Sequence, residues 1–180
     1  MELFNYGLGI VEEKNFIKPN KVNELNNKIN GGLWLCPKTE LYSDWVVLTF
    51  YIPKLVKDPW LIGNTIILKD NVKMAHIDKD NHKEFMKNNC LDFDICKEYD
   101  ILHFDENLIE IKEFEAYYFE CYQILNFECI KNIIIEKLDT NKIISTEYLL
   151  KSKIIFNKII KHLETTEVFK ILKDLKGGTN

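Results

Sequence analysis

The chain has 180 residues, of which 46% are hydrophobic and 12% aromatic. This composition supplies enough apolar material for the core of one domain and excludes an intrinsically disordered chain. The formal net charge is −4, and all 24 basic residues are lysines. An acidic chain without arginine lacks the basic face that a nucleic-acid backbone requires, and it cannot form bidentate guanidinium contacts to phosphate.

Cysteines and targeting signals indicate the compartment. The five cysteines are odd in number and form no Cys-x-x-Cys pair, which is typical of reduced thiols. The first residues, MELFNYG, lack the basic start and apolar core of a signal peptide. The apolar runs, such as WVVLTFYI, are too short to span a membrane. We therefore expect a soluble, cytoplasmic protein with no membrane partner.

The expected elements follow from apolar periodicity and from Gly, Pro and Asn breakers. Strands are predicted at 1–11, 31–37, 64–70, 73–78, 99–104 and 129–138, with a tight turn at Asp70-Asn71. Helices are predicted at 22–29, 78–89, 92–98 and 114–125, followed by a long amphipathic helix from residue 145. Residues 40–52 fit a helix capped by Ser43 as well as a strand, and both alternatives remain open.

These elements predict an α+β fold, because short strands and short helices alternate without a regular strand–helix–strand repeat. We expect one domain over residues 1–144. A helical extension over 145–176 is expected to pack on that domain, and it offers a surface for a homodimer or a partner protein.

The histidines predict no metal site. His76, His82, His103 and His162 show no His-x-x-x-His or Cys-x-x-His spacing. His76 and His82 flank Asp78 and Asp80, which is more typical of a solvated turn than of a ligand set.

Two carboxylates stand at the ends of apolar strands. Asp100 follows Tyr99, and Glu128 lies between Phe127 and Cys129. An acid in such a position must be solvated, hydrogen-bonded or functional, and the sequence leaves these alternatives open.

The stretch NGGLWLCPKTELYSDW, residues 30–45, contains two of the three tryptophans directly after a Gly-Gly pair. Trp34 and Trp45 are either core aromatics behind a simple turn or the wall of a ligand slot.

Several short motifs occur in a fixed order along residues 1–144. They are NYG at 5–7, GGLWLCP at 31–37, SDW at 43–45, YDIL at 99–102, FECIKNIII at 127–135 and TNKII at 140–144. This series resembles the ADP-ribosyltransferase superfamily, especially small phage and bacterial proteins of that fold. The resemblance implies a split antiparallel β-sheet core and NAD-dependent mono-ADP-ribosyl transfer to a protein target, or less readily to a nucleic acid, without a metal.

The resemblance also implies a site. NAD, as substrate, would be bound by residues of the first two motif strands and the SDW segment: Tyr6, Gly7, Gly32, Leu33, Trp34, Cys36 and Trp45. Glu128 and Asp100 would be the catalytic carboxylates, with Glu120 as a further candidate. A carboxylate that binds the ribose 2′-hydroxyl favours the positive charge that develops as nicotinamide leaves.

The chain departs from the superfamily in its catalytic triad. Without arginine, the Arg-Ser-Glu triad is excluded, and the His and Tyr of the other triad would fall at Tyr6 and Trp34. The Ser position holds Cys36, and the usual Glu falls near Asn132. The alternative is therefore a catalytically degenerate binding protein, such as a phage- or mobile-element-encoded inhibitor of a host or defence protein.

Overall fold

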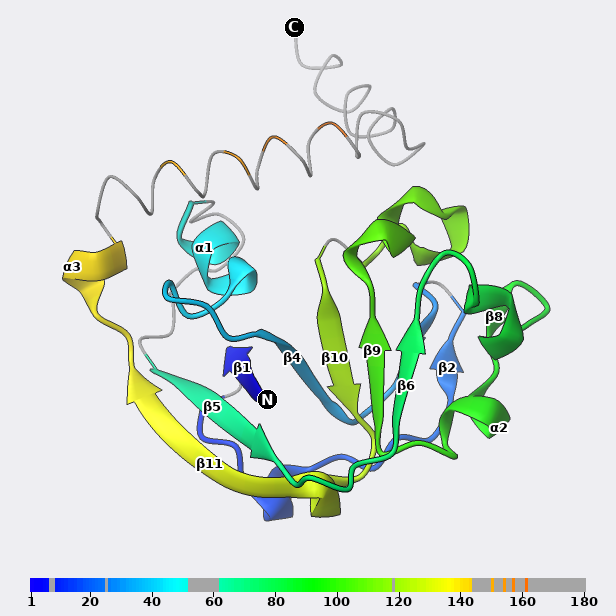
Figure 1. Ribbon diagram of the computed structural model, residues 1–180, viewed down its shortest axis with the longest axis horizontal. Coiled ribbons are helices and arrows are strands. Elements are labelled where there is room, and N and C mark those ends of the chain that lie inside the picture. The colour runs from blue at the N-terminus through cyan, green and yellow to red at the C-terminus, as the bar shows by residue number, and fades with distance from the viewer. Residues whose placement is uncertain are drawn as a thin grey trace, which may run out of the picture.

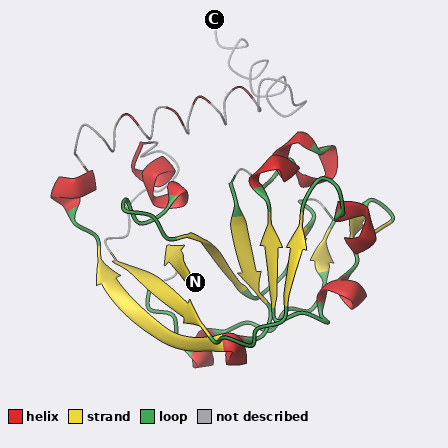
Figure 2. Cartoon of the chain, viewed as in Figure 1, coloured by secondary structure: helices red, strands yellow, loops and turns green. Residues whose placement is uncertain are grey.

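A seven-stranded sheet dominates the protein (Figures 1 and 2). The computed structural model describes residues 1–6, 9–24, 26–51, 62–117 and 119–143, together with 150, 154, 157 and 161. The strand order is β11-β5-β1-β4-β10-β9-β6, and every neighbouring pair is antiparallel except β6 with β9. The strands are β1 (Glu2–Tyr6), β4 (Leu33–Pro37), β5 (Ile62–Leu68), β6 (Met74–Ile77), β9 (Ile101–Phe104), β10 (Cys121–Ile124) and β11 (Ile130–Lys137).

The remaining elements are short and lie at the ends and margins of the sheet (Figure 2). Two-residue strands form the ribbons β2 (Val22–Asn23) with β3 (Lys28–Ile29) and β7 (Met86–Lys87) with β8 (Cys90–Leu91). The α-helices are α1 (Asp44–Tyr51), α2 (Phe93–Cys96) and α3 (Thr140–Ile143). The 3₁₀ helices are η1 (Glu13–Asn15), η2 (His82–Phe85), η3 (Glu106–Glu110), η4 (Lys112–Phe114) and η5 (Phe127–Cys129). The α+β class predicted from the sequence is confirmed.

The central strands bury side chains on both faces of the sheet. Leu33 and Leu35 of β4 pack with Tyr122 in one apolar cluster, whereas Trp34 packs against the other cluster with Phe104. Because successive side chains of a strand point to opposite faces, β4 contributes to both layers. This alternation decides which β4 residues can reach a common site.

The Gly-Gly pair makes the turn into β4. Gly31 and Gly32 have φ of +84° and +69°, a region that side chains with a Cβ enter only with strain. A Cβ on Gly32 would lie 2.5 Å from the carbonyl oxygen of Ile124, and one on Gly31 would lie 2.7 Å from that of Ile17. The glycines thus let the chain pass close to its own backbone.

The predicted strands are all present, and residues 40–52 contain a helix. Ser43 caps α1, because its Oγ accepts a hydrogen bond from the Val46 N–H at 3.3 Å. The turn at Asp70-Asn71 is also present. However, β5 and β6 do not pair with each other and lie in different parts of the sheet.

Three predicted helices are wrong. In 22–29, Asn27 has φ +53°, and its amide bonds to the backbone of Glu113 and Leu91, which fixes a ribbon instead. In 78–89, the Asp78 carboxylate accepts the backbone N–H groups of Asp80 and Asn81, and only the short η2 forms.

The third incorrect helix, 114–125, contains the end of η4 and the strand β10. The Gln123 amide donates to the carbonyls of Ile29 and Gly31, and β10 pairs with β4 and β9. Long-range pairing therefore overrides a local pattern with helical periodicity.

The predicted helical extension at 145–176 lies outside the described residues, apart from four helical positions at 150, 154, 157 and 161. In the described part of the chain, no helix has the length and apolar character needed to cross a membrane.

Candidate functional site

An aromatic pocket of about 300 Å³ lies between β1, β4, the start of α1 and the segment that leads into β10. We call it the aromatic pocket. Six aromatic residues line it, together with a lysine, two cysteines and small or aliphatic groups: Phe4, Tyr6, Trp34, Trp45, Tyr117, Phe119, Lys28, Cys36, Cys121, Leu35, Ser43 and Ala116. Such a lining suits a flat, largely apolar ligand group.

Strand register brings the pocket's floor together. Phe4 of β1 pairs with Cys36 of β4. Tyr122 of β10 pairs with Leu35, so the next antiparallel step brings Cys121 opposite Cys36. Residues more than 80 positions apart in the sequence therefore share one face of the sheet.

Different ring contacts hold the two tryptophans of the pocket lining. Trp34 stacks on Phe104, with ring centroids 5.8 Å apart, and meets Tyr117 edge-on at the same centroid distance. Trp45, at the start of α1, meets Phe119 edge-on at 6.1 Å and is 37% exposed. Phe104 and Tyr117 therefore hold the Trp34 ring in place, whereas Trp45 lies nearer to solvent.

Lys28 supplies the positive charge of the aromatic pocket. Its Nζ lies 5.3 Å from the ring centroid of Trp34 and 5.1 Å from that of Tyr117, within the range of cation–π attraction. Burial lowers the pKa of this ammonium group. A partly desolvated lysine of this kind favours an anionic ligand group.

The two thiols of the pocket are apolar lining at neutral pH. Burial raises the pKa of Cys36 to about 12, and the neighbouring Asp44 carboxylate adds to the increase. Burial raises the pKa of Cys121 well above its ordinary value. Because only a thiolate is a good nucleophile, neither cysteine is suited to nucleophilic catalysis here.

Four of the residues predicted to bind the cofactor meet in the aromatic pocket: Tyr6, Trp34, Cys36 and Trp45. Gly32 lies at the turn against Ile124, and Leu33 is buried in the cluster on the opposite face of the sheet. Gly7 lies outside the described residues. The part of this stretch that lines the pocket is therefore its aromatic and sulfur side chains.

Asp100 and Glu128 lie elsewhere. They line a second, more polar pocket of about 550 Å³, bounded by the end of α2, the start of β9 and the β10–β11 connection. We call it the polar pocket. The Asp100 carboxylate accepts hydrogen bonds from the Lys73 N–H at 3.0 Å and the Asn126 amide at 2.7 Å. It therefore links the loop before β6 to the β10–β11 connection. The structure brings these two acids near each other and places them apart from the aromatic lining.

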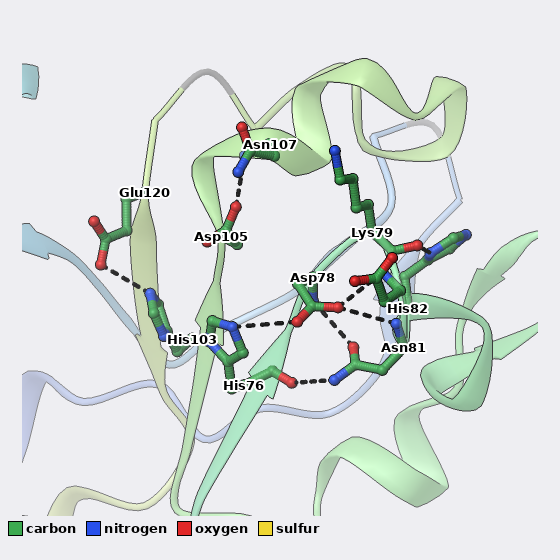
Figure 3. Close-up of polar contacts among 10 residues, drawn as sticks. His76, Asp78, Lys79, Asn81, His82, His103, Asp105, Asn107 and Glu120 are labelled. Carbon is green, nitrogen blue, oxygen red and sulfur yellow. Dashed lines mark hydrogen bonds and ion pairs between the residues drawn. The ribbon is translucent and has the colours of Figure 1, made fainter.

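Glu120, the third acid considered, directly precedes Cys121 of β10. Its Oε1 accepts a hydrogen bond from His103 Nε2 at 2.9 Å (Figure 3). It accepts another from the Tyr122 hydroxyl at 3.0 Å. Its negative charge contributes to the raised pKa of Cys36, after burial and Asp44. This carboxylate is therefore within electrostatic reach of the aromatic pocket.

Sequence reasoning missed Lys28 and the ring of Phe119. Lys28 lies in the polar run NNKIN, where nothing distinguishes it from other surface lysines. Phe119 falls in a segment predicted as helix, so its contact with Trp45 was not foreseeable.

Comparison with known proteins gives no match: no family model, no curated protein and no solved structure is similar to this chain.

Proposed function

We propose that the aromatic pocket binds the nicotinamide end of NAD and that the protein is an NAD-dependent mono-ADP-ribosyltransferase acting on a protein target. One observation carries the proposal. Tyr6, Trp34, Cys36 and Trp45, which come from three motifs of the resemblance, line the same pocket. The sheet would then be the split sheet of that superfamily, with NYG ending β1 and GGLWLCP forming its neighbour β4.

The pocket's size and lining fit part of the dinucleotide. At about 300 Å³ it is at the lower end of ligand pockets, so it suits one ring with its sugar. The flat nicotinamide ring would pack among the aromatic side chains that line the pocket, with Trp45 at the open side. The pyrophosphate and adenosine would then lie at the mouth.

Lys28 is suited to the pyrophosphate. The chain contains no arginine, so a phosphate must be held by lysine, hydroxyl or backbone N–H groups. Lys28 lines the aromatic pocket, and an anion would compensate the desolvation of its ammonium group.

We assign this chemistry to Glu120 in place of Glu128, because its charge reaches the Cys36 thiol of the pocket. Glu120 bonds to Tyr122 and His103 on the opposite face of the sheet, so its 41% exposed side chain must turn around the end of β10 to meet the ribose. As the bond between ribose C1′ and nicotinamide breaks, nicotinamide leaves with the bonding electron pair and the ribose becomes positively charged. A carboxylate that accepts a hydrogen bond from the ribose 2′-hydroxyl stabilises this charge. The nucleophile of the target then forms the new bond to C1′ and loses its proton to solvent. Glu128 is less suited, because it lines the polar pocket.

A second candidate is a binding protein that keeps the pocket without the reaction. The positions that correspond to the superfamily's His, Tyr and Ser hold Tyr6, Trp34 and Cys36. Burial also keeps the Cys36 thiol protonated at neutral pH, because its pKa is raised to about 12. This favours an inhibitor that captures a host or defence protein, such as one encoded by a phage or mobile element.

Two assays on the same variants distinguish these functions. NAD should raise the thermal midpoint of the wild type, because a ligand that binds only the folded state stabilises it. The wild-type protein should also transfer label from NAD to a protein in host lysate. Glu120→Gln should keep the thermal shift and lose transfer, whereas the control Glu128→Gln should keep both. A thermal shift without transfer in the wild type supports the binding protein. No shift at millimolar NAD contradicts the transferase, whereas an inhibitor that captures a protein does not depend on NAD.

A further inference from the structure

Two histidines face each other on neighbouring strands, away from the lining of the aromatic pocket. β6 and β9 pair in parallel, and His76 is in register with His103. Their side chains therefore leave the sheet on the same face, side by side. His76 Nδ1 and His103 Nδ1 are 2.7 Å apart. Figure 3 shows the two rings side by side, between Glu120 and Asp78.

The far nitrogen of each ring faces a carboxylate. His103 Nε2 lies 2.9 Å from Glu120 Oε1, and His76 Nε2 lies 3.4 Å from Asp78 Oδ2. An ionised carboxylate only accepts hydrogen bonds, so it favours the tautomer with hydrogen on Nε2. Each Nδ1 then presents a lone pair toward the other ring, and an ion held between them would replace the hydrogen of this short contact. Metal-binding histidines commonly have this arrangement, in which the second ring nitrogen donates to a carboxylate.

The surroundings hold both rings in place. The Tyr122 ring stacks on His103 with centroids 4.2 Å apart and planes 2° from parallel. The Asp78 carboxylate is fixed by the backbone N–H groups of Asp80 and Asn81, and the Asn81 amide donates to the His76 carbonyl. These bonds do not depend on a bound ion, so the pair is preorganised.

The charge around the pair favours a dication. Asp78 and Glu120 contact the two rings, and Asp105 adds a third negative charge within electrostatic reach of His103. A proton shared between the rings would compensate only one of these charges, whereas a divalent ion compensates two.

We propose that His76 and His103 bind a divalent transition-metal ion that prefers imidazole, such as Zn²⁺, through their Nδ1 atoms. Within the described residues no group of three or more His, Cys, Asp or Glu side chains is placed to hold one ion, so water completes the coordination. Two imidazoles on a tetrahedral zinc with Zn–N bonds of about 2.0 Å have nitrogens roughly 3.3 Å apart. His76 must therefore swing outward by about 0.6 Å, and its side chain is 49% exposed, which permits that movement.

The test is a calorimetric titration of the full chain with Zn²⁺, without NAD, after chelator treatment and with the thiols kept reduced. We expect one ion per chain. His76→Gln should weaken binding by roughly tenfold or more, and Asp78→Asn by about tenfold, because the carboxylate orients the ligand. His82→Gln is the matched control and should bind as the wild type does, because His82 Nδ1 contacts the carbonyl of Lys79 in its own turn.

His76 is the residue of choice because it is half exposed and its replacement should not unfold the protein. Absence of saturable binding in the wild type would overturn the proposal. Equal binding by His76→Gln would also overturn it, because the ion would then be held by other groups of the chain. A third contrary result would be a nitrogen NMR signal showing hydrogen retained on His76 Nδ1 in excess Zn²⁺. The contact would then be an ordinary hydrogen bond between two histidines. None of these outcomes depends on whether the protein uses NAD.

Discussion

The aromatic pocket and the polar pocket differ in what positions their residues. The polar pocket is larger, at about 550 Å³ against 300 Å³, yet its Asp100 is engaged with the backbone of Lys73 and the amide of Asn126. In the aromatic pocket, rings and a half-buried lysine face a common space. Size and acidic residues alone therefore do not identify a site. What favours the smaller pocket is the convergence of side chains from several strands around a partly desolvated cation.

The largest effect should come from Trp34→Ala. It removes the wall that stacks on Phe104, and we expect loss of NAD-dependent thermal stabilisation. The free energy of unfolding should fall by about 3 kcal/mol, as for other large-to-small core changes. Phe127→Ala, in the polar pocket, is the control. Equal loss of NAD binding in both variants would remove the distinction between the pockets.

The turn into β4 should be nearly as sensitive. Gly32→Ala places a Cβ 2.5 Å from the Ile124 carbonyl oxygen at φ +69°, and it should cost about 3 kcal/mol in urea unfolding. Gly9→Ala is matched in φ, at +71°, but its Cβ would meet nothing within 4 Å. For Gly9→Ala we expect the free energy of unfolding to fall by about 1–2 kcal/mol, from backbone strain alone. Similar costs for the two variants would show that close approach at Gly32 is unimportant.

Lys28→Met should weaken the affinity for NAD by about tenfold, because the lost contact is to phosphate. The affinity for free nicotinamide should stay unchanged. Lys97→Met, at the polar pocket, should change neither affinity. Calorimetric titration with each ligand provides the measurement. A loss of nicotinamide binding in Lys28→Met would place the lysine at the ring instead.

The smallest effect concerns pH. Burial lowers the pKa of Lys28 below its ordinary 10.5, so the folded protein releases this proton at a lower pH than the unfolded chain does. Lys28 should therefore lose its charge at an alkaline pH below 10.5, and the contact between Lys28 and the phosphate of NAD should be lost at the same pH. Between the lowered pKa and 10.5 the unfolded chain binds more protons, so the contribution of Lys28 to stability rises with pH. Lys28→Met should abolish both trends in pH-dependent titration and unfolding.

Local sequence was sufficient for much of the sheet. The strand at 31–37 is bounded by Gly and Pro, and the strand at 129–138 is rich in isoleucine, so both have strong local signals. The segment at 114–125 has helical periodicity, but its end forms β10 because β4 and β9 provide partners on both sides. Contacts of that range leave no local signal.

The same limit applies to the sites. Trp34 and Trp45 could be singled out because a Gly-Gly pair and two tryptophans are unusual in this chain. The pairing of His76 with His103 depends on β6 lying beside β9, and the place of Lys28 depends on a two-residue ribbon. The positions of Asp100 and Glu128 relative to the aromatic stretch depend in the same way on the order of strands in the sheet.

The most direct test of the central claim is the thermal midpoint of the full chain with and without NAD, in the wild type and in Trp34→Ala. If the aromatic pocket binds the nicotinamide end of NAD, the nucleotide raises the midpoint of the wild type and leaves that of the folded variant unchanged. A wild type that is unaffected by millimolar NAD, or a variant stabilised as much as the wild type, would contradict the assignment.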